Sequence, residues 1–221
     1  MSTTALERVQ AAAGRLKVFP LPSLVLFPGT AVPLHIFEPR YRAMVKDAIA
    51  TDGVFALAQV PAVGVAELPG SPPLRPILSV GVISLHEERP DGRYDLMLTG
   101  VCRARLIAEH PQDKLYREVQ AELLTDGPTA QDTELTLRRA VLELAARLPE
   151  KAAEQFVKAA SRTKGGGLAD VVAATLVNNV ARRVELLDEL DCQKRLGEVL
   201  REVTAVIARM KAPPPPGGFL N

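Results

Sequence analysis

The sequence predicts an α+β fold, in which a twisted, partly closed β-barrel with one early helix precedes a C-terminal α-helical bundle. Short β-prone runs separated by proline- and glycine-containing turns fill residues 16–125, with one helical pattern among them. After the break Asp126-Gly127-Pro128, residues 130–211 repeat apolar side chains at three- and four-residue steps. The proline- and glycine-rich residues 212–221 are expected to be a disordered tail. Because no long linker separates barrel and bundle, we expect them to pack as one compact body.

The composition predicts a soluble protein of the cytoplasm. The 221 residues are 47% hydrophobic and 24% charged, and 27 Lys and Arg against 26 Asp and Glu give a net charge of +1. This balance provides no general attraction to nucleic acid or to anionic membranes. We find no apolar core of a secretory signal and no run of about 18 apolar residues, so no membrane segment is expected. Two distant cysteines, Cys102 and Cys192, fit a reducing compartment.

The chain begins with a weak helical signal and continues with strands punctuated by prolines. Residues 1–15 place apolar side chains at helical spacing with nothing to anchor them, which predicts a short or frayed helix. Two or three strands are expected from Lys17 to Phe37, with Pro28-Gly29 as the turn between the runs Leu24–Phe27 and Val32–Phe37. Proline donates no ladder hydrogen bond, so these strands suit the edge of a sheet.

A helix is expected from Glu38 to Ala50. Proline is tolerated at a first helical position, where Pro39 stands, and the residues that then share one face at helical spacing are Tyr41, Met44, Val45, Ala48 and Ile49. The Glu38 carboxylate is placed to accept hydrogen bonds from the first helical amides, which is a structural role.

Further runs complete the predicted barrel. Residues 54–60 predict a buried strand, and the proline- and glycine-rich residues 61–76 predict an exposed loop. Ile77–Glu87 and Tyr94–Leu106 flank a turn sequence at residues 90–93, which favours an antiparallel hairpin. Tyr116–Leu124 alternates apolar and polar residues, as a half-buried strand does.

The bundle is expected to contain helices over residues 133–148, 150–162, 168–180 and 184–190, and a last helix capped by Asp191. Lys164–Gly167 is expected to be a flexible connector, because glycine has the widest backbone freedom. It lacks the GxxxxGK[ST] pattern of a phosphate-binding loop and follows a helix, so we predict no phosphate site there.

One stretch carries a family resemblance. LPSLVLFPGTAVPLHIFEPRYRAMVKDAI, residues 21–49, resembles the opening of the N-terminal, substrate-binding domain of Lon proteases. The resemblance continues through Gly81–Ile83, Leu98–Arg105, Leu168–Asp170 and Arg183–Asp191, and covers residues 16–210. It implies a PUA-like pseudo-barrel in the first half. We find no counterpart of that family's ATPase motor or Ser-Lys proteolytic domain in these 221 residues.

No set of catalytic, cofactor-binding or metal-binding residues is predicted. The three histidines, His35, His86 and His110, lie in separate elements and form no HExxH pattern. Cys102 has no evident base partner and is predicted to be a small buried hydrophobe. We therefore expect no enzyme activity and no cofactor. A peptidase that acts alone is a disfavoured alternative, because it needs a nucleophile and a base.

The resemblance and the missing catalytic set favour a binding module for unfolded or hydrophobic polypeptide segments, which it would present to a separate protease. A proline-rich sheet edge with unpaired amides can add a peptide strand. The candidate contacts are Val32, Leu34, His35 and Phe37, joined by Arg40, Tyr41 and the loop 61–76. Arg40 and Tyr41 also fit a structural role together with Glu38, which we favour.

Two further hypotheses remain. RNA binding is suggested by other PUA-like barrels and by the basic residues Arg40, Arg42, Arg103, Arg105, Arg182 and Arg183. It is disfavoured, because only 4% of the residues are aromatic and few bases could stack. In the tail, Phe219 and Leu220 either belong to a disordered terminus, which we favour, or dock into a groove of the same or a neighbouring molecule and support weak self-association.

Overall fold

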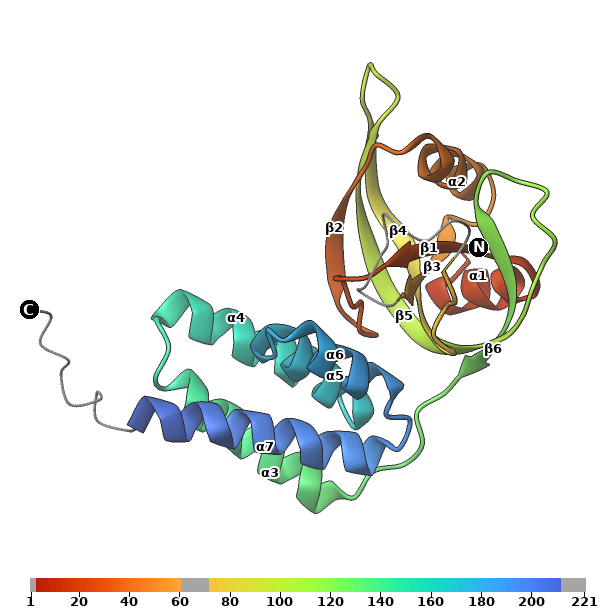
Figure 1. Ribbon diagram of the computed structural model, residues 1–221. Helices are drawn as coiled ribbons and strands as arrows, with labels where there is room; N and C mark the ends of the chain where they lie inside the picture. The colour runs from red at the N-terminus through yellow and green to blue at the C-terminus, as the bar shows by residue number, and fades with distance from the viewer. Residues whose placement is uncertain (1–2, 61–71, 212–221) are drawn as a thin grey trace, which may run out of the picture.

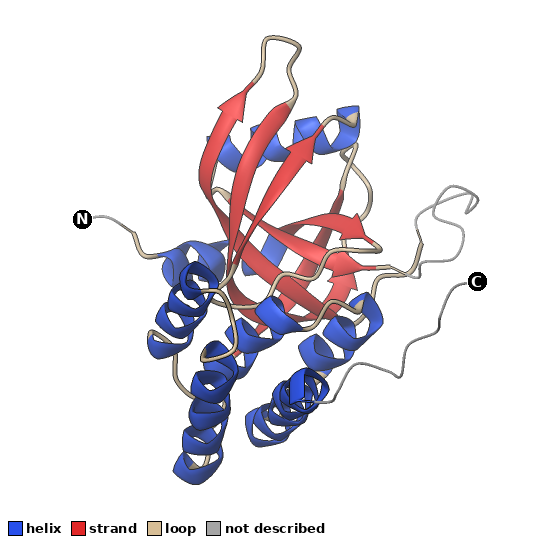
Figure 2. Cartoon of the chain, turned by 90° about the vertical axis from the view of Figure 1, so that its left-hand side faces the viewer, coloured by secondary structure: helices blue, strands red, loops and turns tan. Residues whose placement is uncertain are grey.

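The computed structural model describes residues 3–60 and 72–211. A strongly curved sheet forms a barrel, and a helical bundle packs beneath one end of it (Figures 1 and 2). This confirms the predicted α+β fold of a barrel followed by helices. The tail at residues 212–221 and most of the predicted loop at 61–76 lie outside the described residues.

The barrel is built from β1 (Leu16–Leu21), β2 (Ala31–Ile36), β3 (Val54–Gln59), β4 (Ile77–Glu88), β5 (Tyr94–Glu109) and β6 (Arg117–Leu124). The strand order is β2-β5-β4-β3-β1-β6, and a further β5–β6 pairing closes the ring. β1 and β3 are parallel, and the β4–β5 hairpin is antiparallel as predicted. Since β5 bonds to three strands, β2 is left outside the closed ring with one neighbour.

The run Leu24–Phe27 is not a strand, which corrects one prediction. Its backbone is irregular, yet Val25, Leu26 and Phe27 are buried. Leu26 joins the barrel core, whereas Val25 and Phe27 join the core of the bundle, so the segment is a wedge between the two. The predicted turn at Pro28-Gly29 is confirmed. It is held by a hydrogen bond from the Gly29 N–H to the Gly100 carbonyl at 2.9 Å.

The N-terminal helix α1 (Ala5–Ala12) is anchored, contrary to expectation. A reciprocal capping box joins Thr4 and Glu7, and Val9 is fully buried in the barrel core. Arg8 Nε also donates to the Asp52 carbonyl at 2.6 Å. The capping box is local to residues 1–15, whereas the contacts of Arg8 and Val9 are long-range and could not be read from that segment alone.

Helix α2 (Pro39–Ala50) confirms the predicted helix, with Pro39 in its first turn. Its buried residues Tyr41, Met44, Val45 and Ala48 pack into the barrel. The helix covers the end of the barrel away from the bundle (Figure 1).

The bundle contains α3 (Gln131–Ala145), α4 (Glu150–Ser161), α5 (Gly166–Leu176), α6 (Val180–Asp188) and α7 (Cys192–Lys211). Asp191 caps α7 as predicted, since its Oδ1 accepts from the Lys194 N–H at 3.0 Å. The glycine run is not a loose connector. Gly166 starts α5 in so tight a place that a Cβ there would lie 2.1 Å from Asp126 Oδ2 and 2.3 Å from Arg195 Nη2.

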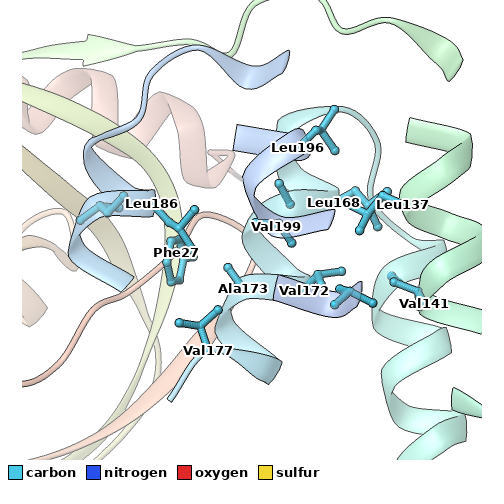
Figure 3. Close-up of a cluster of buried hydrophobic side chains, with 14 of the residues drawn as sticks. Phe27, Leu137, Val141, Leu168, Val172, Ala173, Val177, Leu186, Leu196 and Val199 are labelled. Carbon is cyan, nitrogen blue, oxygen red and sulfur yellow. The ribbon is translucent and has the colours of Figure 1, made fainter. Parts of the chain in front are cut away.

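Barrel and bundle share a buried core. Phe27 points into the helices beside Leu186, Ala173 and Val177 (Figure 3). Barrel and bundle also share an ion pair. Arg103 of β5 donates two hydrogen bonds to the Asp170 carboxylate of α5, at 2.7 and 2.8 Å.

Arg195 of α7 completes a buried network around Asp170. It approaches Asp170 Oδ1 at 3.2 Å and Asp126 at 2.7 Å, while Arg103 Nε also donates to the Leu187 carbonyl at 2.8 Å. Arg103, Asp170 and Arg195 are each at most 3% exposed. Buried charges of this kind are stable only when all are paired.

Candidate functional site

β2 has an open edge. Among the described strands it pairs with β5 alone, over Ala31–Ile36. Directly before this ladder, the Gly100 N–H donates to the Thr30 carbonyl at 2.8 Å. Bonded and non-bonded pairs alternate along antiparallel strands, so every second residue of β2 turns its backbone groups away from β5. These outward-facing residues are Ala31, Pro33 and His35. Since proline has no N–H, the edge offers two donors and three carbonyl acceptors.

Apolar side chains lie on the outer face of the sheet beside this edge. Pro33 is directly opposite Met97 of β5, and Met97 is opposite Leu85 of β4. Opposed residues of antiparallel strands share a face, so these side chains form one row. Leu85 is 70% exposed, and Phe37, directly after β2, is 60% exposed. We call the edge and this row the edge surface, which comprises Ala31, Pro33, His35, Phe37, Leu85 and Met97.

The structure places the predicted contacts of β2 on two different sides. Leu34 is buried in the barrel core and the partly buried Val32 packs against that core, so both lie on the inner side of the strand. His35 and Phe37 lie on the outer side, with stacked rings whose centroids are 6.1 Å apart. His35 Nδ1 also lies 2.6 Å from Asp95 Oδ1, which fixes its ring against β5.

Arg40 and Tyr41 line a separate cavity of about 270 Å³ between β1, the start of α2 and residues 112–117. The buried Tyr41 ring packs 4.4 Å from the Phe19 ring, and the Arg40 guanidinium lies 4.6 Å above Tyr41. Arg40 donates to Glu38 Oε2 at 2.8 and 3.0 Å. Glu38 makes no side-chain cap of α2, so the predicted bond to the helical amides is wrong.

Tyr116, which also lines this cavity, belongs to a hydrogen-bonded triad with Asp47 and Lys114. The Tyr116 hydroxyl donates to Asp47 Oδ2 at 2.6 Å, and Lys114 Nζ donates to the same carboxylate oxygen at 2.7 Å. Burial, together with the hydrogen bond to Asp47, raises the pKa of Tyr116 to about 12. The triad ties the segment between β5 and β6 to α2.

We expect Tyr116 to make stability fall at alkaline pH. Its folded pKa exceeds the unfolded value of about 10, so its stabilisation is present below pH ~10 and is lost as the pH rises toward 12. Between these values the free energy of unfolding of the wild type should fall more steeply than that of Tyr116→Phe. Urea denaturation at a series of pH values measures the difference. Parallel pH profiles for the two proteins would contradict this coupling.

The family model described as the ATP-dependent protease La (LON) substrate-binding domain matches residues 15–205. The chain therefore belongs to the Lon substrate-binding domain family. It is 28% identical over 193 residues to Lon protease 2 of Myxococcus xanthus, a match that spans 84% of this chain and 23% of the relative. Lon protease of Paraburkholderia phytofirmans is 30% identical over 201 residues, covering 87% of this chain and 24% of the relative. The chain thus spans about a quarter of the length of these Lon proteases.

Two solved structures share the fold. The N-terminal domain of Mycobacterium avium complex Lon protease superposes with a TM-score of 0.65 at 18% identity, covering 86% of this chain and 98% of that one. A Lon N-terminal domain protein from Xanthomonas campestris gives 0.60 at 24% identity, covering 85% of this chain and 97% of that one. The fold expected from the Lon resemblance is therefore confirmed.

His110 and Cys102, singled out in the sequence, have surroundings that fit a structural role in this Lon-type domain. His110 Nε2 lies 2.9 Å from the Gly14 carbonyl oxygen, and burial raises the pKa of the Cys102 thiol to about 11. The described residues contain no group of three His, Cys, Asp or Glu side chains arranged to hold a metal ion. Within residues 3–60 and 72–211, no helix is long and apolar enough to cross a membrane.

Most of the basic residues considered for RNA are bound to protein oxygens. Arg105 pairs with Glu122 at 3.0 Å, Arg182 with Glu202 at 2.7 Å, and Arg183 donates to the Ala174 carbonyl at 2.7 Å. Arg40 and Arg103 are held by Glu38 and Asp170. Phosphate binding would have to displace these contacts, so the geometry disfavours the RNA hypothesis.

Proposed function

We propose that this chain binds an extended, apolar polypeptide segment along the open edge of β2. The observation that carries the proposal is the edge surface, which combines unpaired backbone groups with exposed apolar side chains in one place. An added strand would bond to the outward groups of β2 and rest alternate side chains on the outer face. Membership in the Lon substrate-binding domain family supports this role.

Binding along this edge is expected to be weak and tolerant of sequence. Backbone hydrogen bonds do not depend on side-chain identity, and Pro33 removes one donor from the edge. The apolar row is open to solvent, with Leu85 70% and Phe37 60% exposed. These features suit a protein that samples many unfolded segments.

His35→Pro tests the backbone contact. His35 is at a position not bonded to β5, so proline removes an outward N–H without removing a ladder bond. We expect affinity for a labelled apolar peptide, or for a permanently unfolded protein, to fall about fivefold or more in fluorescence anisotropy. The matched control His35→Ala also loses the Asp95 contact but keeps the N–H, and should stay close to the wild type.

The apolar row gives a second comparison. Phe37→Ser removes an exposed side chain of the edge surface, whereas Leu135→Ser removes one from α3, where Leu135 is 49% exposed. Phe37→Ser should weaken binding and Leu135→Ser should not. Equal affinities for all these variants would contradict binding at β2, and the absence of binding by the wild type would reject the function.

We further propose that the chain holds such a segment for a separate protease without cleaving it. Support comes from its relatives, which are Lon proteases about four times its length. A casein assay with and without ATP should show no hydrolysis by the purified chain. Hydrolysis that survives purification and disappears with one substituted side chain would replace this proposal with the peptidase alternative.

A further inference from the structure

A groove continues the open edge of β2 toward the bundle. It has a volume of about 420 Å³ and lies between Gly29–Ala31 on the barrel side and α4 and α5 on the other, with walls that include Ala159, Arg162 and Ala174. Its barrel side ends at Ala31, the first residue of β2. The small residues along it leave room for a polypeptide backbone. A segment held along β2 would therefore extend into this groove.

The groove carries a positive charge with no counter-charge. Arg162 is its one charged lining residue, and no hydrogen bond or ion pair of the Arg162 side chain occurs within the described part of the chain. The hydroxyls of Thr163 and Thr175, which also line it, donate to the backbone carbonyls of Ala160 and Val171 at 3.2 and 2.9 Å. Among the described side chains that line the groove, the guanidinium is thus the one with free donors.

The cavity at Tyr41 provides the contrast. It contains two guanidiniums, but Arg40 is paired with Glu38 at 2.8 Å and Arg117 with Glu109 at 2.6 Å. Each positive charge there is already neutralised by the protein. Of these two sites, only the groove has an arginine without a protein carboxylate as its partner among the described residues. A bound polypeptide can supply that carboxylate.

We propose that the groove binds a carboxylate of the polypeptide segment held on β2, with Arg162 as its ion-pair partner. The inference rests on the proposed function. The carboxylate is either the C-terminus of the segment or an Asp or Glu side chain near that end. If it is the C-terminus, the segment runs opposite to β2, because the groove adjoins the first residue of that strand. Antiparallel addition is also the slightly more stable pairing.

Three labelled apolar peptides of about ten residues, long enough to span the edge and the groove, test this proposal. One has a free C-terminal carboxylate, one is amidated, and one is amidated but has glutamate as its last residue. Their dissociation constants are measured by anisotropy with the wild type, Arg162→Ala and Arg139→Ala. Arg139 is an exposed arginine of α3, so its substitution removes the same charge elsewhere.

For the wild type we expect the free-acid peptide to bind about five- to tenfold tighter than the amide. Arg162→Ala should abolish this preference, and Arg139→Ala should keep it. If the glutamate peptide also binds more tightly than the plain amide, and this difference depends on Arg162, the site accepts side-chain carboxylates. If only the free-acid peptide binds more tightly than the amide, the site is assigned to chain ends. If the three peptides bind the wild type with equal affinity and His35→Pro still weakens their binding, the inference is overturned and the proposed function stands. If no peptide binds the wild type, both are rejected.

Discussion

Asp170→Ala is expected to lower the free energy of unfolding by about 3–5 kcal/mol, because it leaves buried positive charge without a partner. Asp170 is fully buried between Arg103 of the barrel and Arg195 of the bundle. Both arginines are themselves buried, at 3% and 0% exposed. A loss of this size is a large share of the stability of an ordinary domain, about 5–15 kcal/mol. Asp170→Asn keeps the shape and loses the charge, and should also be strongly destabilised.

Glu122→Ala is the matched control. Glu122 pairs with Arg105, which lies two residues from Arg103 on the same strand, but the side chains of this pair are 46% and 55% exposed. Its loss should change stability by about 1 kcal/mol or less. Urea denaturation of the wild type and the three variants gives the comparison. If Asp170→Ala and Glu122→Ala cost the same, the network around Asp170 does not hold barrel and bundle together.

Arg103 and Arg105 show what a sequence pattern leaves open. Their spacing predicts that they share a face of a strand, and the sequence contains nothing that separates them further. The bundle covers that face at Arg103 only, so one is a buried tether and the other a solvated surface residue. Burial of this kind depends on residues 67 positions away in the chain, such as Asp170. The helical patterns of the bundle are local, and those were predicted closely.

The edge surface was predicted only in part, because some of its residues follow from a local pattern and others from the pairing of distant strands. The prolines of residues 19–39 favour edge strands, which is right for β2 but not for β1, because β1 contains Pro20 and pairs with both β3 and β6. The alternation of strand side chains could have separated Leu34, which is buried, from His35 and Phe37, which are not. Met97 and Leu85 were missed, because only the pairing register brings them beside Pro33.

Phe27→Ala is expected to destabilise the protein by about 3–5 kcal/mol. Phe27 is the last residue of the irregular segment Leu24–Phe27, yet it is fully buried, and its side chain lies among those of the helices in Figure 3. Truncation would leave a cavity bordered by Leu186, Ala173 and Val177, and the backbone around it has little freedom to collapse. A Cβ on the neighbouring Gly100 would lie only 2.3 Å from the Phe27 carbonyl oxygen, so the strand already touches this segment.

Phe37→Ala is the matched control, because it makes the same Phe-to-Ala change at an exposed position. Phe37 lies ten positions later and is 60% exposed. Its truncation deletes the same atoms, but from an exposed position and not from a core. The free energy of unfolding should therefore change by about 0.5 kcal/mol at most. The two variants should therefore have opposite profiles. Phe27→Ala lowers the midpoint of urea unfolding, whereas Phe37→Ala lowers peptide affinity and leaves the midpoint unchanged. A small effect of Phe27→Ala on unfolding would mean that barrel and bundle do not depend on the wedge between them.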